Sequence, residues 1–410
     1  MTVIADLHIH SRYSNATSYQ MELPTLAEGA RRKGIDLLGT GDCTQPDWLD
    51  TLSSELRDEG NGIYSHGGTS FLVTGEVSLV WKHDGRGRRI HMVLLVPSLD
   101  DAVRIHEALS PRGNLVYDGR PMLGLSAPDF CEIVWEQSPD TLLIPAHVWT
   151  PWYSVFGAKS GFDSLEECFG EFTDRIYAIE TGLSSDPPMN RRVSALDHLQ
   201  LVSNSDAHSP AKLAREATLF DMKDISFEAI ARALKTGDGY AGTFEFYPQE
   251  GKYHHDGHRA CGISWSPEQS MAVDNVCPVC GKTLTIGVLH RVMDLADRVE
   301  PELGDIPFKS LIPLAEIISQ SVGVGVGSKK VAKIYDAMLE RHGTELDILS
   351  NTRLISSCQE HPSAYWKALP KCEPVISPSS PATTASSAKS GSRLRRRISN
   401  LNRAVLQFAT

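Results

Sequence analysis

The chain has 410 residues, of which 41% are hydrophobic and 22% are charged, as in ordinary soluble proteins. Its length predicts two or three domains. It has no apolar run of 18 residues and no basic stretch leading into an apolar one at its start. The sequence therefore predicts neither a membrane span nor a secretory signal, and we expect a cytoplasmic protein. The net charge of −11 argues against a polyanionic partner, unless much of the acid binds metal.

Residues 1–245 alternate short apolar runs with helical patterns, which is typical of parallel βα units. There are enough units to close a barrel, and the pattern alone also allows an open doubly wound sheet. The apolar runs lie at residues 3–9, 35–42, 71–81, 89–97, 141–148, 175–182 and 199–208.

Most of these runs carry acids or histidines toward their trailing ends. In an α/β barrel the trailing ends of the strands gather at one face, where sites are built. Several side chains that can bind metal should therefore converge there. They are Asp6, His8, His10, Asp42, Glu76, His91, His147, Glu180, Asp206 and His208.

The first run contains His-x-His, and alternate residues of a strand point to the same side. His8 and His10 would therefore present two imidazoles side by side, with Asp6 on the same face. Asp206 and His208 repeat the two-residue spacing near the end of the region. Because imidazole and carboxylate are common ligands of divalent ions, we predict a metal site here instead of isolated structural histidines.

Residues 246–300 change to loops rich in Cys and His and predict a zinc-binding module. His258 and Cys261 form one pair with two residues between them, and Cys277 and Cys280 form another. Fifteen residues separate the two pairs, which is typical of a structural zinc site. His254 and His255 compete for the fourth position, but neither has the two-residue spacing of the other pair. The predicted ligands of one structural zinc ion are His258, Cys261, Cys277 and Cys280.

Residues 301–372 have helical patterns, with a Gly-rich, basic stretch at 321–330 between two of them. This stretch lacks the residue order of a P-loop. It fits either a plain helical hairpin or a turn whose backbone amides contact DNA phosphate. Residues 373–410 are rich in Ser, Pro and Ala and include an Arg-rich stretch. They predict a disordered tail that binds DNA non-specifically or a partner protein.

The motifs of residues 1–245 resemble those of the PHP (polymerase and histidinol phosphatase) family. The resemblance implies a distorted barrel, usually of seven βα units, that binds two or three divalent ions and hydrolyses phosphoesters. We therefore expect an α/β fold with an appended zinc-binding module and a small helical segment. Zinc, manganese and magnesium are all candidates for the barrel ions. The motifs are "DLHIH", "GTGD", "GE", the His of "RIHMV", the "AH" of "IPAHV" and "SDAH".

The same resemblance implies which residues hold each ion. One departure is "TGDC", where the family usually ends the motif in Asp-His, and it affects only the third ion. We expect the catalytic residues to be Asp206, Glu76 and His147, because bound cations activate water and clamp the attacking and leaving oxygens. The implied ligands are His8, His10, Glu76 and Asp206 for the first ion, Glu76, His91 and His147 for the second, and Asp42 and His208 for the third.

Joined to such a barrel, the stretches "YHHDGHRACGISWSPEQS" and "VCPVCGKTLTIGVLHRVMDLADR" resemble the endonuclease Q family. The likeness covers residues 1 to about 370. It implies cleavage of DNA on the 5′ side of a deaminated base (hypoxanthine, uracil or xanthine) or of an abasic site. DNA would then be the partner, and we expect the protein to associate with the nucleoid.

The loop after His147 crowds aromatic rings beside a predicted ligand. Trp149, Trp152 and Tyr153 lie there, with Lys159 close behind. Packing at the mouth of the barrel explains such rings, but exposed rings also stack on a base that has been extruded from a duplex. These four residues are therefore our candidate substrate contacts.

A PHP-type barrel also suits an enzyme that acts on a small phosphorylated metabolite. The zinc module and the helical segment favour the larger substrate, because a small ester needs neither. A non-catalytic DNA-binding protein is a third possibility. The full set of predicted ligands argues against it, since a site without chemistry does not need them together.

Overall fold

The computed structural model describes residues 1–304 and 307–350. By their internal contacts they divide into two compact units. The first unit comprises Met1–Arg31 and Ile35–Leu311, so it contains both the barrel and residues 246–300. The second comprises Arg32–Gly34 and the chain from Ile312 onward. The tail predicted at 373–410 and the last part of the predicted helical segment lie outside the described residues.

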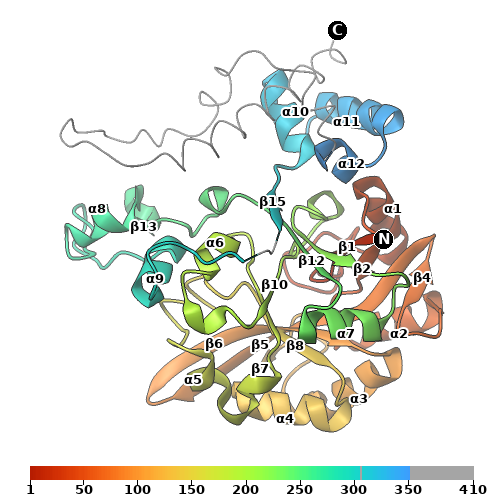
Figure 1. Ribbon diagram of the computed structural model, residues 1–410, viewed down its shortest axis with the longest axis horizontal. Helices are drawn as coiled ribbons and strands as arrows, with labels where there is room; N and C mark the ends of the chain where they lie inside the picture. Colours follow the sequence, from red (N-terminus) through yellow and green to blue (C-terminus); the bar gives the residue numbers. More distant parts are fainter. Residues whose placement is uncertain (305–306, 351–410) are drawn as a thin grey trace. The chain divides into compact units, whose positions relative to one another are not determined.

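The strands of the first unit form one large sheet and two strand pairs (Figure 1). They are β1 (Thr2–Asp6), β2 (Leu37–Gly39), β3 (Arg57–Asp58), β4 (Tyr64–His66), β5 (Thr69–His83), β6 (Arg86–Val96), β7 (Met122–Leu123), β8 (Leu142–Pro145), β9 (Ala178–Glu180), β10 (Gln200–Val202), β11 (Ala217–Asp221), β12 (Tyr240–Glu245), β13 (Asp256–His258), β14 (Ile263–Trp265) and β15 (Phe308–Ser310).

Helices connect these strands, and three more follow β15 among the described residues. Those of the first part are α1 (Leu23–Lys33), α2 (Pro46–Glu55), α3 (Leu99–Leu109), α4 (Ala127–Gln137), α5 (Leu165–Phe169), α6 (Pro187–Asn190), α7 (Phe227–Thr236), α8 (Pro267–Met271) and α9 (Val288–Leu295). The second unit holds α10 (Leu314–Val322), α11 (Lys329–His342) and α12 (Glu345–Ser350). Among the described helices, none is long and apolar enough to cross a membrane.

The strands of the large sheet run in the order β15-β12-β11-β1-β2-β5-β4-β3, with β6 joining β5 to β8. The parallel pair of β9 and β10 lies beside β8 on one side and beside β12 on the other. The strands therefore continue around a barrel. This confirms the predicted α/β fold with an appended cysteine–histidine module.

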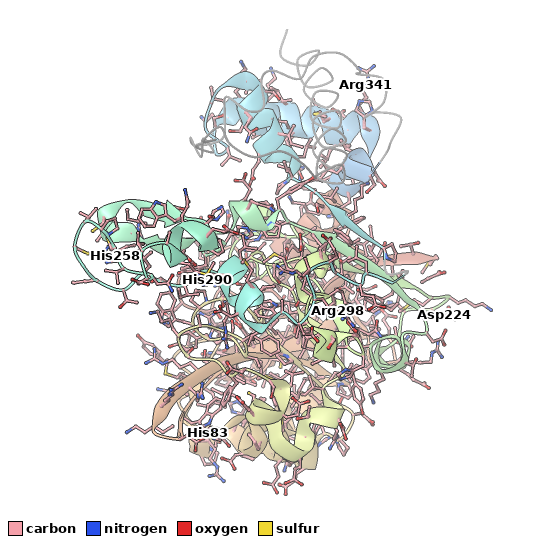
Figure 2. The ribbon with its side chains drawn as sticks, turned by 60° about the vertical axis from the view of Figure 1, so that its left-hand side comes forward. His83, Asp224, His258, His290, Arg298 and Arg341 are labelled. Carbon is pink, nitrogen blue, oxygen red and sulfur yellow. The ribbon has the colours of Figure 1, made fainter. Side chains whose placement is uncertain are left out.

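Not every neighbouring pair of strands is parallel. β1, β2 and β5 pair in parallel, as predicted, but β5 and β6 form a long antiparallel hairpin. Asp84 and Gly85 make its turn with φ values of 49° and 74°, the left-handed conformations that a tight hairpin turn needs. The basic residues Arg86, Arg88 and Arg89 follow this turn at the start of β6, and His83 beside the turn is labelled in Figure 2.

Serine caps begin several helices of the barrel. The hydroxyls of Ser98, Ser126 and Ser226 accept hydrogen bonds from the third backbone N–H of α3, α4 and α7, which satisfies a donor that the helix itself leaves free. Ile230 and Leu234 of α7 are buried in the same hydrophobic cluster as residues of the barrel strands. The apolar face of α7 therefore packs against the barrel strands.

Residues 250–300 fold around the antiparallel pair of β13 and β14. The Asp256 carboxylate accepts hydrogen bonds from His290 Nδ1 (2.6 Å) and from the Gly287 backbone (2.5 Å), which ties β13 to α9. Arg291 of α9 donates to the carbonyls of Phe156 and Phe162 in the barrel. Figure 2 labels His258 and His290 in this segment.

In the second unit, α10, α11 and α12 pack around a buried glutamate. Glu345 accepts hydrogen bonds from the Leu314 backbone (2.9 Å) and the Tyr335 hydroxyl (2.6 Å). Ser328 caps α11, which follows the glycine-rich turn, and Gly323 ends α10 with a φ of 67°. The helical hairpin expected around 321–330 is therefore present.

Another acid is buried inside the barrel. Glu245 of β12 accepts hydrogen bonds from the hydroxyls of Thr181, Ser203 and Thr243. Burial raises the pKa of Glu245 from 4.5 to about 8, and the nearby Asp186 also acts to raise it. The carboxyl is thus protonated at neutral pH in the folded chain, whereas in the unfolded chain it is ionised.

This difference makes stability depend on pH. The pKa of Glu245 is higher in the folded chain than in the unfolded chain. Its contribution to the free energy of unfolding is therefore complete below the unfolded pKa and is lost as the pH rises through about 8. We predict that the free energy of unfolding falls between about pH 6 and about pH 9. Glu245→Gln, which stays neutral, should flatten that fall to less than about half.

Urea denaturation of both proteins at the two pH values measures the effect. Glu132→Gln, which changes an exposed residue of α4, is the control and should keep the wild-type slope. A Glu245→Gln protein with the wild-type slope would show that another group titrates.

Candidate metal centre

The first donor group joins residues from three strands. It consists of His8 and His10, which follow β1, of Glu76 on β5 and of Asp206, which follows β10. Their ligand atoms all lie within 4.8 Å of one another. The Nε2 atoms of His8 and His10 are 3.4 and 3.2 Å from Glu76 Oε2. His10 Nε2 is also 3.1 Å from Asp206 Oδ1. Two imidazoles and two carboxylates at this spacing suit a divalent ion.

The second donor group shares Glu76 with the first. Its other members are His91, on β6 opposite β5, and His147, which follows β8. Glu76 Oε1 lies 2.7 Å from His91 Nδ1 and 3.4 Å from His147 Nε2. One carboxylate oxygen thus faces each donor group. A carboxylate in this position can bridge two neighbouring ions.

Two buried atoms in these groups have no hydrogen-bond partner. Among the described residues, neither His8 Nε2 nor Glu76 Oε1 has a partner in hydrogen-bonding geometry, although His91 Nδ1 lies 2.7 Å from Glu76 Oε1. Their side chains are almost fully buried, with 1% of each exposed. A buried polar atom without a partner costs free energy, so such atoms in a native fold require an explanation. A bound cation supplies one, because both atoms then become ligands. The residues present therefore fit divalent metal ions.

The charges of the site support the same conclusion. Burial alone would raise the pKa of Glu76, but His91, His8 and Arg120 together hold it well below its ordinary value. For Asp206, likewise, the hydrogen bond from His10 and the charge of His8 outweigh burial and lower the pKa. Both carboxylates therefore stay ionised. Burial lowers the pKa of His91 to about 4, so this imidazole is neutral at pH 7, as a metal ligand must be.

Buried carboxylates orient the two histidines of the first strand. His8 Nδ1 lies 3.0 Å from both oxygens of Glu180. His10 Nδ1 lies 3.0 Å from Asp42 Oδ1. Burial alone would lower the pKa of both imidazoles, but the surrounding carboxylates raise it well above its ordinary value, so each Nε2 keeps a proton until a bound ion replaces it. Glu180 also accepts a hydrogen bond from the backbone of His147 (2.9 Å), so it orients ligands of both groups.

The third ligand group that the family resemblance implies, Asp42 and His208, stays a prediction. Asp42 Oδ2 accepts hydrogen bonds from the Ser11 backbone, the Ser11 hydroxyl and the Ser14 hydroxyl at 2.6–2.9 Å. His208 packs its ring 4.4 Å from that of His10. Within residues 1–304 and 307–350, neither belongs to a group of converging ligand atoms. In the structure Asp42 is also a hydrogen-bonding partner of His10.

The expectation that Asp6 joins the ligands is wrong. Its carboxylate accepts backbone hydrogen bonds from Ser205 and Ala214, both at 2.9 Å. Asp6 thus fastens the end of β1 to the loop that carries Asp206. It lies on the predicted strand, but its oxygens are used by backbone amides and not by an ion.

Several residues of the site have strained backbones. The φ values of Asp42, His147 and Asp206 are 50°, 29° and 47°, in the left-handed region that side chains other than glycine rarely adopt. Such conformations cluster at functional sites, where the surrounding fold holds them. Opposite His147, Gly182 is required, because a Cβ at this position would lie 2.5 Å from the His147 Cβ.

A pocket of about 750 Å³ opens beside the second donor group. Its walls come from the barrel and from the segment that leads into the cysteine–histidine module. Charged and aromatic side chains make up much of its lining. They include His91, Arg120, His147, Trp152, Tyr153, Asp206, Arg215, Lys252 and Tyr253.

The structure separates the four candidate substrate contacts. Trp152 and Tyr153 line the pocket, and Tyr153 packs its ring 4.7 Å from that of His91. Trp149 is 1% exposed and donates its indole N–H to Asn190, so it is a core residue. Lys159 is exposed and does not line this pocket. Sequence alone did not separate the buried ring from the exposed ones, because all lie in one irregular loop.

Sequence reasoning missed the two arginines of the pocket. Arg120 Nη1 lies 3.1 Å from Glu76 Oε2, and Arg215 donates to the carbonyls of Ser205 and Asp206. Arg120 belongs to a loop without periodicity or metal-binding motif, so no pattern indicated it. Arg215 lies seven positions after His208 in the sequence, beyond the "SDAH" motif.

The third donor group lies in the segment of residues 250–300. It consists of His258, Cys261, Cys277 and Cys280, whose ligand atoms lie within 4.8 Å of one another. Cys280 Sγ is 3.8 Å from His258 Nδ1. Neither His254 nor His255 belongs to the group. The geometry thus favours His258 over both competitors, as its spacing predicted. Three thiols and one imidazole are a typical ligand set of structural zinc.

We predict that Cys277→Ser removes about one zinc ion per chain and lowers the melting temperature, because a structural zinc site stabilises its module. Atomic emission and thermal unfolding measure the two effects on the same samples. Cys131→Ser is the control, since Cys131 is buried in α4 away from the cysteine group. It should lower stability at unchanged zinc content. Equal zinc in the wild-type and Cys277→Ser proteins would contradict the assignment.

Comparison with known proteins adds independent findings. The family model described as "PHP-associated" matches residues 190–238, and the one described as "MJ0043 C-terminal domain" matches residues 313–359. The uncharacterized protein YqxK of Bacillus subtilis is 29% identical over 364 residues, which cover 85% of this chain and 88% of YqxK.

Two solved structures match most of the chain. One is the lesion-specific endonuclease PfuEndoQ of Pyrococcus furiosus, with a TM-score of 0.76, 34% identity and 85% of each chain covered. The other is endonuclease Q in complex with a 27-mer duplex that has an abasic lesion at the active site, with a TM-score of 0.77, 34% identity and 87% of each chain covered. The chain belongs to the endonuclease Q family of PHP-type enzymes.

Proposed function

We propose that this protein is a metal-dependent DNA endonuclease that cuts the phosphodiester on the 5′ side of a deaminated base or an abasic site. The observation that carries the proposal is the pair of donor groups that share Glu76 at the edge of a pocket. The endonuclease Q structures support it, since one holds a duplex with an abasic lesion at its active site. Hypoxanthine, uracil and xanthine are the deaminated bases that we propose.

The two donor groups have defined roles in this proposal. The first would hold one divalent ion and the second another, and Glu76 is a member of both groups. When bound, the ions activate water and stabilise charge on the attacking and leaving oxygens. Glu180 and Asp42 hold His8 and His10 in the orientation that leaves Nε2 available. Zinc, manganese or magnesium can occupy these positions, and we propose two ions, with a third not required by the geometry.

The pocket is where the damaged nucleotide would be held. Its volume of about 750 Å³ lies in the range of small-ligand sites. Trp152 is 38% exposed, and its ring lies 5.9 Å from that of Tyr253. An exposed ring at such a mouth can stack on a base that has left the duplex. We therefore propose Trp152 and Tyr153 as substrate contacts.

The same pocket argues against a small phosphorylated metabolite as the substrate. Lys252 and Tyr253 line it, and they belong to the segment that leads into the predicted zinc module. An enzyme for a small ester has no need of that segment beside its site.

We further propose that the turn of residues 323–328 contacts DNA phosphate, since it precedes the capped N-terminus of α11. The basic stretch at 393–397 lies outside the described residues.

We predict that Asp206→Asn abolishes nicking, with a loss of roughly 100-fold or more, because it removes charge from the first donor group. The assay is cleavage of a labelled duplex with a single hypoxanthine in the presence of manganese. Circular dichroism and DNA binding should stay close to the wild type. A variant that unfolds, or that nicks at the wild-type rate, would contradict the role proposed for Asp206.

The choice of substrate is tested with wild-type protein. We predict that labelled duplexes with one hypoxanthine, uracil, xanthine or abasic site are cut 5′ of the lesion, while an undamaged duplex of the same sequence stays intact. Mapping the cut on a sequencing gel gives the position. Release of phosphate from small esters, with every duplex left whole, would instead favour a metabolite phosphatase.

A further inference from the structure

We propose that Arg120 is a catalytic residue that binds the non-bridging oxygens of the phosphate under attack. The inference rests on the proposed function and deepens it. Arg120 is not a metal ligand and belongs to none of the motifs that define the donor groups. Its position, its partners and its accessibility each support the role.

The loop that carries Arg120 is fixed by hydrogen bonds from several sides. Asp118 accepts hydrogen bonds from the Asn15 backbone and side chain (3.1 and 2.6 Å) and from the Arg120 backbone (3.2 Å). The carbonyl of Pro121 accepts a hydrogen bond from Ser78 of β5 (2.9 Å). The loop is thereby tied both to the segment after β1 and to the strand that carries Glu76.

The residue before Arg120, Gly119, packs closely against the site. Gly119 donates its backbone N–H to the carbonyl of Tyr13 (3.0 Å). A Cβ at Gly119 would lie 2.2 Å from Asp42 Oδ2 and 2.5 Å from the Ser14 hydroxyl. The loop therefore lies directly against the carboxylate that orients His10. This close packing places Arg120 at the centre of the site and leaves its loop little freedom to move.

The guanidinium of Arg120 can donate hydrogen bonds to a ligand in the pocket. Nη1 lies 3.1 Å from Glu76 Oε2, and in the described part of the chain Glu76 is its one hydrogen-bonding partner. A guanidinium has five N–H donors, so others remain for a ligand. The side chain is 25% exposed and lines the pocket. An arginine guanidinium keeps its positive charge in proteins.

The chemistry of the reaction needs such a group. During hydrolysis a water molecule gives up a proton to solvent as its oxygen bonds to phosphorus, one P–O ester bond breaks, and the leaving oxygen takes a proton from solvent. Negative charge is spread over the non-bridging oxygens meanwhile. Arg120 transfers no proton in this scheme. Its planar guanidinium donates hydrogen bonds to those oxygens, which suits phosphate better than the point charge of lysine does.

A purely structural role is the competing explanation. In that case Arg120 would only hold Glu76 in place for the ions. Loss of Arg120 would then lower metal content, whereas loss of a phosphate contact would leave metal content unchanged. Phosphate affinity separates the two roles without depending on cleavage.

The experiment compares the wild type with Arg120→Gln, Arg120→Lys and the control Arg57→Gln. Arg57 is 77% exposed on β3, and its change removes the same charge away from the pocket. Inorganic phosphate is titrated calorimetrically into each manganese-loaded protein, and bound metal is measured by atomic emission. Single-turnover nicking of an abasic duplex is measured in parallel.

We expect Arg120→Gln to weaken phosphate binding by roughly tenfold or more and to slow nicking by about 100-fold. Metal content should not change. Arg120→Lys should recover part of both losses, and Arg57→Gln should match the wild type. Unchanged phosphate affinity in Arg120→Gln, no phosphate binding by the wild type, or loss of metal from Arg120→Gln would each overturn the assignment. If no duplex is cut, the proposed function fails, while the phosphate titration still decides the role of Arg120.

Discussion

The position of one buried carboxylate organises the site. Glu76 lies in the middle of β5, with one oxygen toward His8 and His10 and the other toward His91 and His147. A buried anion in such a place is costly unless cations surround it. The arrangement of strands provides this, because β1 and β6 bring histidines to the two sides of β5.

The surrounding residues explain why the ligands hold their geometry before any ion binds. Glu180 and Asp42 orient histidines through Nδ1, and Asp6 ties the loop of Asp206 to β1. Left-handed backbone at Asp42 and Asp206 adds strain that the barrel must hold. Acids that look alike in the sequence thus have two different tasks. Some face the proposed ions, and others keep the ligands in place.

Sequence patterns predicted the fold and brought attention to the residues of both barrel donor groups. The spacing of His8 and His10 works because a strand alternates its sides. Spacing does not tell whether an oxygen faces an ion or a backbone amide, so Asp6 was misassigned. Spacing also does not show that β5 and β6 pair in antiparallel fashion, which places His91 beside the strand of Glu76. Nor does it indicate Arg120, which reaches Glu76 only because of how its loop folds. Trp149 was indistinguishable from Trp152, since burial of a loop ring depends on tertiary packing.

The shared position of Glu76 can be observed directly by anomalous diffraction at the manganese edge from crystals soaked in manganese. Two anomalous peaks roughly 4 Å apart, one on each side of the Glu76 carboxylate, would be the expected result. One peak alone, or peaks that lie away from the histidines of the barrel, would contradict the two-ion centre on which the proposed nuclease depends.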